Sequence, residues 1–298
     1  MKNIILQRVG IVLLTLVMII SLGGCGTKES ERVIRIGSKD FTESLVVAEI
    51  YALALEDAGF KVERNMNIAG SVIHAAITNG EIDLYPEYTG TGLLAILKMD
   101  LITDPVEVYN TVKSAYAEQF GITWLEQSKA NDSNGLVIRT AMAQEYGIYT
   151  VSDLQKQADK VRLASQGEFE YREDGIPGLE KVYGPFNFKS IKLYDNGLKY
   201  AILENNEADV APAYTTEGQL TNTELFTLLK DDLYFWPPYY LAPIVRNEVL
   251  EANPEIEGIL NEVSATLDTE TVTALNAKVD VDKMEYEEVA KTYFESIK

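Results

Sequence analysis

The sequence predicts an α/β protein that is divided into two lobes. Beyond residue 32, short apolar runs typical of strands alternate with amphipathic stretches typical of helices. Even without its first 24 residues, the 298-residue chain is long for one domain and long enough for two lobes of ordinary size. A short motif also occurs twice, once in each half of the chain, which favours two lobes of similar construction.

The periodicity of the apolar residues places the individual elements. Strands are expected over residues 33–36, 60–68, 135–139, 161–164, 191–194 and 209–213. Helices are expected over residues 43–58, 72–79 and 105–120, and the chain from residue 254 onward is mostly helical. Thr42 is expected to cap the first helix and Gly59 to end it, while Pro105 suits a first helical turn, where its missing N–H costs nothing.

The repeated motif carries the strongest functional signal. Residues 81–92 and 207–218 both spell E-x-D-x-x-P-x-Y-T-x-x-G, and each copy places a Tyr-Thr pair just past a predicted strand. In open α/β sheets, ligands bind beyond the carboxyl ends of strands. The motif therefore predicts a cleft to which each lobe contributes one aromatic wall, namely Tyr88 and Tyr214. Packing of both tyrosines at the rims of two similar turns is the alternative.

Residues 1–24 have the features of a secretory signal peptide. Lys2 and Arg8 supply a basic start, and the apolar run 9–20 is shorter than the roughly 20 residues that a membrane span needs. The Leu-Gly-Gly-Cys tetrapeptide that ends at Cys25 resembles the lipobox of bacterial lipoproteins. We therefore expect Cys25 to be acylated and residues 25–32 to form a tether. A non-cleaved anchor helix with an incidental cysteine is the alternative.

Both interpretations of the N-terminus place the rest of the chain outside the cytoplasmic membrane. With acylation, the protein is expected on the extracellular face, held by its lipid alone. The formal net charge of −20 argues against nucleic acid and anionic lipid as partners. Cys25 is the only cysteine, so an internal disulfide is excluded and the fold depends on its core.

Catalytic and metal-binding patterns are not found in the sequence. His74 is the one histidine and lies within an apolar helical stretch, which is more typical of packing than of a general base. The chain contains neither a G-x-S-x-G elbow nor a Cys/His cluster that would hold zinc. Phosphate-binding glycine loops are also missing. These observations predict a protein without catalytic residues, metal or cofactor.

Aromatic residues are the most conspicuous feature of the composition. The chain has 17 tyrosines and 2 tryptophans, and several gather in residues 231–240, where two prolines stiffen the backbone before Tyr239. A quaternary ammonium group cannot donate a hydrogen bond, so proteins bind it with the electron-rich faces of rings. Each desolvated ring contact contributes on the order of 0.5–2 kcal/mol.

Several stretches, in order along the chain, resemble one family. They are IGSKDFTE (36–43), DLYPEYTG (83–90), FEYREDGIP (169–177), PAYTT (212–216), PPY (237–239) and LDTET (267–271). Together they are similar to the OpuC/ProX-type substrate-binding proteins of osmoprotectant ABC importers. The resemblance implies a bilobal class II periplasmic binding protein, or Venus flytrap. Lobe 1 would comprise residues 33–131 and 243–298 and lobe 2 residues 132–242, joined by a two-segment hinge.

The resemblance also implies a binding site, carried over position by position. Tyr88, Tyr214 and Tyr239 would face a trimethylammonium group, and Asp132 would lie beside this cage. Three further residues, Lys39, Thr91 and Arg172, match the positions that hold the carboxylate of the ligand. The partner implied is an ABC permease with its ATPase, served by a binding protein that we expect to be monomeric.

One position departs from the family pattern. Asn134 stands where family members carry a further aromatic residue. The missing wall would weaken a small betaine or leave room for a bulkier one, and Asn134 itself would be free to hydrogen-bond a polar substituent. The ligands considered are therefore glycine betaine, choline, carnitine and bulkier betaines such as ergothioneine. A different solute such as an amino acid, a secreted enzyme, and an adhesin or sensor are the remaining alternatives.

Overall fold

The computed structural model describes residues 33–166 and 169–298. Within this part, residues 34–298 form one compact unit. The expected signal peptide, the acylated Cys25 and the 25–32 tether lie outside the described residues. In the described ranges, no helix combines the length and the hydropathy that a bilayer span requires.

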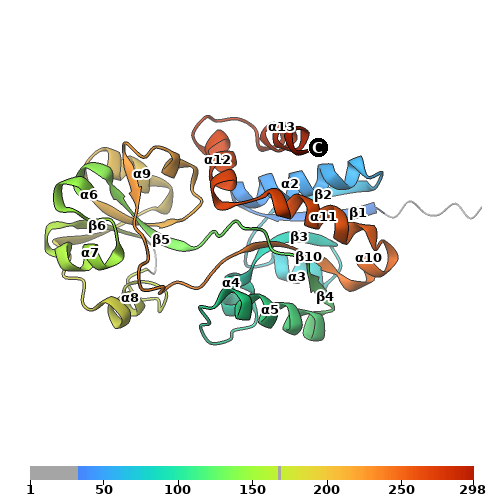
Figure 1. The fold of residues 1–298 in the computed structure, drawn as a ribbon, viewed down its shortest axis with the longest axis horizontal. Coiled ribbons are helices and arrows are strands. Elements are labelled where there is room, and N and C mark those ends of the chain that lie inside the picture. Colours follow the sequence, from blue (N-terminus) through green and yellow to red (C-terminus); the bar gives the residue numbers. More distant parts are fainter. Residues whose placement is uncertain (1–32, 167–168) are drawn as a thin grey trace, which may run out of the picture. The chain divides into compact units, whose positions relative to one another are not determined.

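Two five-stranded sheets carry the fold (Figure 1). The first has the order β2-β1-β3-β10-β4, with β1 Val33–Lys39, β2 Lys61–Ile68, β3 Leu84–Tyr88, β4 Ile122–Trp124 and β10 Leu241–Arg246. The second has the order β7-β6-β8-β5-β9, with β5 Asn134–Arg139, β6 Arg162–Gln166, β7 Ser190–Tyr194, β8 Val210–Tyr214 and β9 Phe226–Leu228. In each sheet a parallel pair (β1 and β3, or β6 and β8) is followed by a strand that runs antiparallel. The expected α/β fold with two lobes is confirmed.

Two segments of the chain connect the sheets. The first sheet takes its strands from residues 33–124 and 241–246, and the second from residues 134–228. The connecting segments run antiparallel, because an isolated β-bridge joins Asn131 in the first to Tyr240 in the second (Figure 1). The exact lobe limits implied by the resemblance stay a prediction.

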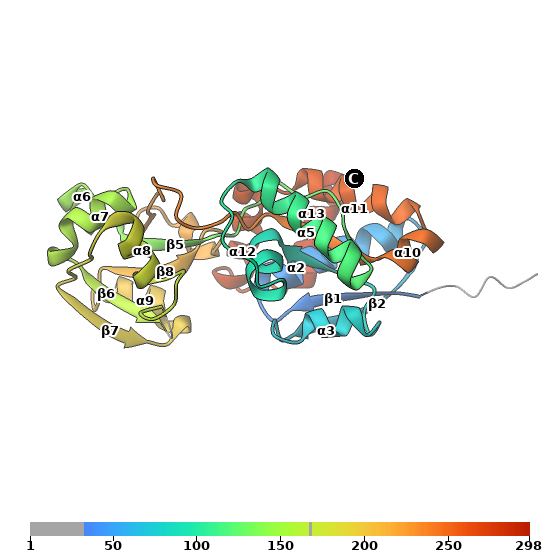
Figure 2. The same cartoon turned by 90° about the horizontal axis from the view of Figure 1, so that it is seen from below.

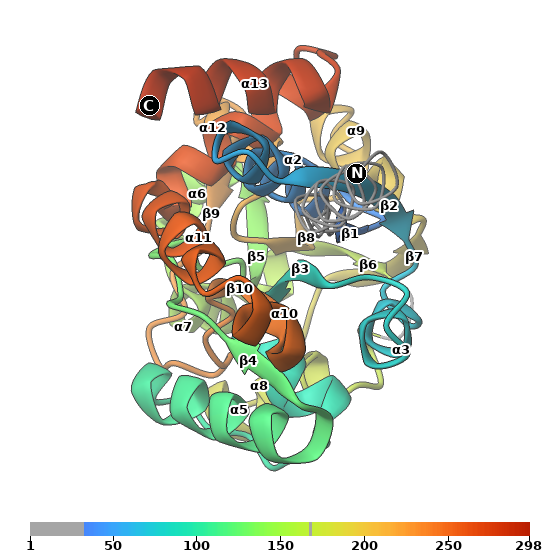
Figure 3. The same cartoon turned by 90° about the vertical axis from the view of Figure 1, so that its right-hand side faces the viewer.

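The helices of the first lobe are contributed by both ends of the chain. They are α2 Thr42–Asp57, α3 Ile73–Thr78, α4 Thr89–Thr91, the π-helical turn η1 Gly92–Ile96, α5 Pro105–Phe120, α10 Asn247–Ala252, α11 Glu255–Thr266, α12 Thr269–Asp280 and α13 Tyr286–Ile297. Helix α2 contacts α11, α12 and α13 (Figure 3). Its Ile50, Tyr51 and Leu55 are fully buried, so the C-terminal helices complete the core that begins with α2.

The helices of the second lobe surround β5, β6 and β8 (Figure 2). They are α6 Thr140–Tyr146, α7 Val151–Gln157, η2 Ala158–Lys160, α8 Ile176–Tyr183, η3 Asn196–Leu198, α9 Lys199–Glu204 and η4 Gly218–Thr221. Leu136, Leu163, Val210 and Trp236 form part of one buried cluster in this lobe. Each lobe therefore has its own apolar core.

Local signals explain where several helices begin and end. Asp104 accepts a hydrogen bond from the Glu107 N–H at 2.9 Å, and Pro105 is the first residue of α5, as expected. The expected cap at Thr42 is wrong, because Thr42 is already helical. Its hydroxyl instead donates to Asp280 of α12 at 2.5 Å, a partner 238 residues away that local sequence does not reveal.

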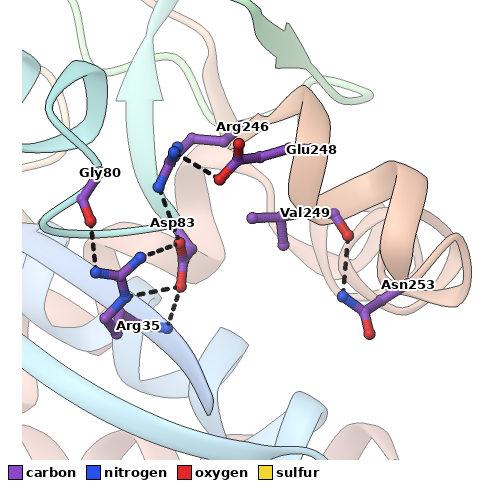
Figure 4. A network of polar contacts seen from close by, with 7 residues as sticks. All are labelled: Arg35, Gly80, Asp83, Arg246, Glu248, Val249 and Asn253. Carbon is purple, nitrogen blue, oxygen red and sulfur yellow. Dashed lines mark hydrogen bonds and ion pairs between the residues drawn. The ribbon is translucent and has the colours of Figure 1, made fainter. Parts of the chain in front are cut away.

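The aspartate of the first motif copy organises the end of the first sheet. Asp83 accepts hydrogen bonds from the Arg35 backbone N–H at 2.9 Å and from the Arg35 Nη2 at 2.7 Å. A second arginine, Arg246 of β10, lies 3.4 Å from the same carboxylate (Figure 4). The buried carboxylate thereby ties together β1, β3 and β10.

The aspartate of the second copy does the same in the second sheet. Asp209 accepts hydrogen bonds from the Arg162 backbone N–H at 2.9 Å and Nη2 at 2.7 Å, and from the Arg139 Nη2 at 2.6 Å. Burial alone would raise the pKa of Asp209, but the hydrogen bonds from Arg162 and Arg139 lower it to about 2. The E-x-D part of the motif is therefore a structural device that occurs once in each lobe.

Candidate ligand-binding site

A cavity of about 870 Å³ is lined by every ligand-binding residue that the sequence analysis named. It is lined by Lys39, Tyr88, Thr91, Asp132, Asn134, Arg172, Tyr214 and Tyr239, together with others. Tyr88 ends β3 in the first sheet and Tyr214 ends β8 in the second. The carboxyl ends of two corresponding strands thus open on one cavity, which is where an open α/β sheet binds its ligand.

The threonine after Tyr88 fixes one of the two connecting segments. Its hydroxyl, Thr89 Oγ1, donates to the Pro238 carbonyl at 3.1 Å and accepts from the Tyr240 N–H at 3.0 Å. The Thr89 N–H donates to the Tyr240 carbonyl at 3.0 Å. The backbone on either side of Tyr239 is therefore held against the end of β3.

The threonine after Tyr214 fixes the other connecting segment in the same way. Thr215 Oγ1 donates to the Asn131 carbonyl at 2.8 Å and accepts from the Ser133 N–H at 2.9 Å. The Thr215 N–H donates to the Ser133 carbonyl at 2.9 Å. Each Tyr-Thr pair thus presents a ring to the cavity and fastens a hinge segment, which explains why the motif occurs once in each lobe.

Tyr239 is positioned by its backbone and by a glycine. Its N–H donates to Asn131 Oδ1 at 2.7 Å, and its carbonyl accepts from the Asp132 N–H at 3.1 Å. The ring lies against Gly90, where an added Cβ would come 2.7 Å from the ring carbon Cδ1. A side chain at position 90 would therefore displace this wall of the cavity.

The environments of the tyrosine rings differ. Tyr88 is 3% exposed, its hydroxyl donates to Glu43 Oε1 at 2.8 Å, and its ring centroid lies 5.9 Å from that of Phe41. Tyr214 is 48% exposed, and Lys199 Nζ lies 5.6 Å from its ring centroid. Burial raises the pKa of Tyr239 to about 12, so this phenol is neutral at physiological pH. All three rings are present at the cavity as neutral, electron-rich surfaces.

The cations that the resemblance assigns to a ligand carboxylate are already paired. Lys39 is buried, forms an ion pair with Glu87, and holds its Nζ 5.0 Å from the centroid of the Tyr88 ring. The Arg172 side chain is 58% exposed, and its Nε donates to Asp174 Oδ1 at 2.7 Å. A ligand carboxylate would therefore compete with two protein carboxylates for these groups. The assigned roles of Lys39, Thr91 and Arg172 stay predictions.

Two buried carboxyl groups lie at the cavity, one of which the sequence analysis missed. Asp132 Oδ1 accepts from Thr216 Oγ1 at 2.7 Å, and Glu43 accepts from Tyr88 and from Asn276 Nδ2, the latter at 3.1 Å. Burial raises the pKa of both carboxyl groups, and the proximity of Glu43 raises that of Asp132 further. Glu43 ends the IGSKDFTE stretch that resembles the family, but only tertiary structure brings it near Asp132.

Asn134 lies directly beside the exposed ring. It is the first residue of β5 and is paired across the sheet with Tyr214. Directly opposed residues of antiparallel strands hold their Cβ atoms about 4.5–5.5 Å apart. The side chain at position 134 therefore decides what covers the flank of Tyr214.

His74 takes no part in the cavity. Its ring packs edge-on against Phe120 and Tyr116, with centroid distances of 4.7 and 5.5 Å, and burial lowers its pKa. The packing role that the sequence favoured for this histidine agrees with these contacts. In residues 33–166 and 169–298, no cluster of three or more His, Cys, Asp or Glu side chains could hold a metal ion.

Comparison with known proteins assigns this site to a family. Residues 32–296 match the family described as the substrate-binding domain of the ABC-type glycine betaine transport system. The chain belongs to this family. Membership covers nearly the whole of the described fold and confirms the resemblance seen in the sequence.

Individual relatives agree with the family assignment. The carnitine transport binding protein OpuCC of Listeria monocytogenes is 33% identical over 92% of this chain and 90% of its own length. The ergothioneine transport permease/binding protein EgtU of Helicobacter pylori is 32% identical over 90% of this chain, which spans only 48% of that protein. A crystal structure of a glycine betaine/carnitine/choline ABC transporter protein has a TM-score of 0.82 and 28% identity, over 88% of this chain and 98% of its own.

The family fixes the general function of the chain. It is the substrate-binding component of an ABC transporter, and its fold is the bilobal periplasmic-binding-protein fold expected from the resemblance. The named relatives are transport proteins, not enzymes.

Proposed function

We propose that this chain captures a quaternary-ammonium solute against Tyr88, Tyr214 and Tyr239 and delivers it to an ABC permease with its ATPase. The observation that carries the proposal is the arrival of these three rings, from the ends of β3 and β8 and from a connecting segment, at one cavity. A permanently charged ammonium that offers no N–H is attracted by such faces. Three contacts, each on the order of 0.5–2 kcal/mol, are enough to select it over a neutral solute.

The buried carboxyl groups support the same ligand class. Glu43 and Asp132 line the cavity, and a bound cation would favour the ionised forms of both carboxyl groups. A betaine also carries a carboxylate, for which Lys39, Thr91 and Arg172 are the candidate partners at the same cavity. We therefore favour a zwitterionic betaine over a simple cation such as choline.

Titration calorimetry separates this proposal from its alternatives. The protein is titrated with glycine betaine, carnitine, choline and ergothioneine, and with unmethylated glycine and histidine as controls. We expect the trimethylated compounds to bind and their unmethylated counterparts to bind at least about tenfold more weakly, since each lost ring contact weakens the complex. Binding of the primary amines alone would reject the cage and favour an amino-acid receptor. Turnover of a bound compound would favour an enzyme.

A bulkier betaine is the second candidate. The cavity of about 870 Å³ is near the upper end of the roughly 300–1,000 Å³ typical of small-molecule sites. Asn134 also stands where the family resemblance places an aromatic wall. Ergothioneine is a betaine with a large side group, and one relative is named as an ergothioneine-binding protein, which supports this candidate.

We also propose that Cys25 is acylated after removal of residues 1–24, which would hold the protein at the extracellular face of the cytoplasmic membrane as a monomer. The support is the basic start, the apolar run and the Leu-Gly-Gly-Cys tetrapeptide of the sequence. Mass spectrometry of the purified N-terminal peptide should show a diacylated cysteine. We also expect Cys25→Ala to be released into the medium while the wild type stays on the cells. An unmodified, uncleaved N-terminus would reject the proposed acylation.

A further inference from the structure

A second, smaller cavity adjoins the first in the second lobe. It measures about 230 Å³ and shares the lining residues Asn134, Arg172, Asp174 and Tyr214 with the larger cavity. Its remaining lining residues are Gly135, Gln166, Phe169, Lys199, Pro212 and Ala213. We call it the side cavity. Because these four residues belong to both, they form the boundary between the two spaces, and Asn134 and Tyr214 are paired across the sheet there.

The strand arrangement explains why the side cavity opens at this place. Gln166 is the last residue of β6 and Tyr214 the last of β8, and these strands are parallel neighbours. Their carboxyl ends meet at one edge of the sheet, with Asn134 of β5 on the other side of Tyr214. The side cavity therefore continues the position at which this fold binds ligands.

The lining of the side cavity combines an apolar wall with hydrogen-bond donors. Phe169, Pro212 and Ala213 supply apolar surface. Lys199 is 4% exposed, forms an ion pair with Glu217 and points its ammonium toward the Tyr214 ring. Gln166 Nε2 is buried and has no hydrogen-bond partner among the described residues. A buried donor without an acceptor is costly, and a ligand that supplies the acceptor removes this cost.

Asn134 is too short to fill the boundary between the two cavities. An aromatic side chain at this position would face Tyr214 directly across the strand pair, close enough to stack on it and fill the boundary. Asparagine is shorter, and its amide adds an NH2 group that donates and a carbonyl oxygen that accepts. Position 134 therefore controls whether a ligand in the larger cavity can extend past Tyr214.

We propose that the side cavity is a subsite for a hydrogen-bond-accepting side group of the ligand, received by Gln166. The preferred ligand is then a trimethylammonium carboxylate that carries a polar side group, with its ammonium on the three tyrosines and its side group beside Lys199 and Phe169. A compact betaine would leave the subsite unused. This inference rests on the proposed function and narrows its substrate class.

The test uses the full chain and two probes that differ in the side group. In ergothioneine, the carbon next to the carboxylate carries a methylene-linked ring with an accepting sulfur, whereas glycine betaine has no side group. We expect wild type to bind ergothioneine more tightly. Gln166→Leu should weaken ergothioneine about fivefold, the loss of about one hydrogen bond, and leave glycine betaine within about twofold. Gln144→Leu, at an exposed position of α6, is the matched control and should change neither affinity.

A second variant protects the test against misfolding. Asn134→Tyr should weaken ergothioneine and tighten glycine betaine, because the larger side chain fills the boundary and restores an aromatic wall. Equal losses for both probes, no loss for either, or tighter wild-type binding of glycine betaine would overturn the subsite while leaving the cage intact. Failure of every trimethylammonium compound to bind would instead reject the proposed function itself.

Discussion

The two lobes use the same framework but present different aromatic walls. In each, an aspartate binds two arginines from neighbouring strands, and a threonine fastens one connecting segment. Tyr88 of the first lobe is 3% exposed and hydrogen-bonded to Glu43, whereas Tyr214 of the second is 48% exposed. The framework thus positions both rings, while the surroundings determine how far each is ordered before a ligand arrives.

This difference suggests a division of labour between the lobes. A ring that is already desolvated and hydrogen-bonded loses little entropy on binding, so Tyr88 acts as a preformed wall. Tyr214 loses exposed surface only when a ligand covers it, and its contact then contributes to holding the two lobes on the ligand. Affinity should therefore respond strongly to Tyr214, and stability to Tyr88.

The largest expected effect tests whether the two frameworks are equivalent. Asp209→Asn should lower the free energy of unfolding by about 2 kcal/mol, because Arg139 and Arg162 lose a buried carboxylate while remaining partly solvated. Asp83→Asn should cost a similar amount. Urea denaturation followed by tryptophan fluorescence measures both, with Asp159→Asn at an exposed position as control.

The pH dependence of the same variants provides a further check. The pKa of Asp209 is lowered to about 2 in the folded state, so its contribution is present above the unfolded pKa of about 4 and is lost as pH falls toward 2. The difference in the free energy of unfolding between wild type and Asp209→Asn should decrease as pH falls from about 4 toward 2. If only one of the two aspartate substitutions lowered the free energy of unfolding, the two frameworks would not be equivalent.

The next effect concerns the exposed ring. Tyr214→Ala should weaken a trimethylammonium ligand about tenfold, or about 1.4 kcal/mol, without lowering the melting temperature. Tyr88→Ala should weaken binding and also destabilise the fold, because it empties a buried site and leaves Glu43 without its donor. Calorimetric titration and thermal melts distinguish the two. Tyr234→Ala, 72% exposed and outside the cavity lining, is the control.

A smaller effect tests whether Arg172 binds the carboxylate of the ligand. Arg172→Ala should weaken glycine betaine about fivefold and choline little, since only the betaine offers a carboxylate to the exposed guanidinium. Titrating both ligands against the variant measures the difference. Equal losses would mean that Arg172 holds the second lobe in shape through Asp174 and does not touch the ligand.

The smallest effect is a coupling between binding and protonation. Burial raises the pKa of Glu43 and Asp132. In the free protein, the stability that their protonated forms contribute is therefore present below the unfolded pKa of about 4. It is lost as pH rises through the pKa values of the folded state. A bound cation favours their ionised forms and lowers these pKa values. Binding should therefore release protons, and affinity should rise by about threefold over the pH interval in which they titrate.

Calorimetry in two buffers of different ionisation enthalpy measures this release directly. Glu43→Gln should reduce the number of protons released, whereas Glu56→Gln, on the exposed side of α2, should not. If Glu43→Gln released as many protons as wild type, the protons would come from another group.

The sequence predicted the repeated and local features and missed the long-range ones. The capping of α5 by Asp104 and the positions of Tyr88 and Tyr214 at strand ends follow from patterns within a few residues. The partner of Thr42, by contrast, is Asp280 at the other end of the chain. Likewise, Glu43 reaches the cavity because α2 begins beside it, and Asn276 joins it from α12. Such groups are brought together only by the packing of the C-terminal helices against α2.

The positions of the charges were also beyond the reach of the sequence. The resemblance assigned Lys39 and Arg172 to a ligand carboxylate, with surface ion pairs as the alternative, and each is paired with an acidic residue, Lys39 with Glu87 and Arg172 with Asp174. With 46 acidic residues in the chain, the sequence offers many partners and no means of choosing Glu87 or Asp174 among them.

The most direct test of the aromatic cage compares glycine betaine with an isostere that lacks its positive charge. Glycine betaine and tert-butylacetate have the same shape and the same carboxylate, but carbon replaces the charged nitrogen in the second. If three electron-rich rings recognise the positive charge, calorimetry should show glycine betaine binding at least about tenfold more tightly. Equal affinity for the two compounds would show that the cavity recognises only an apolar shape, and would contradict the cage.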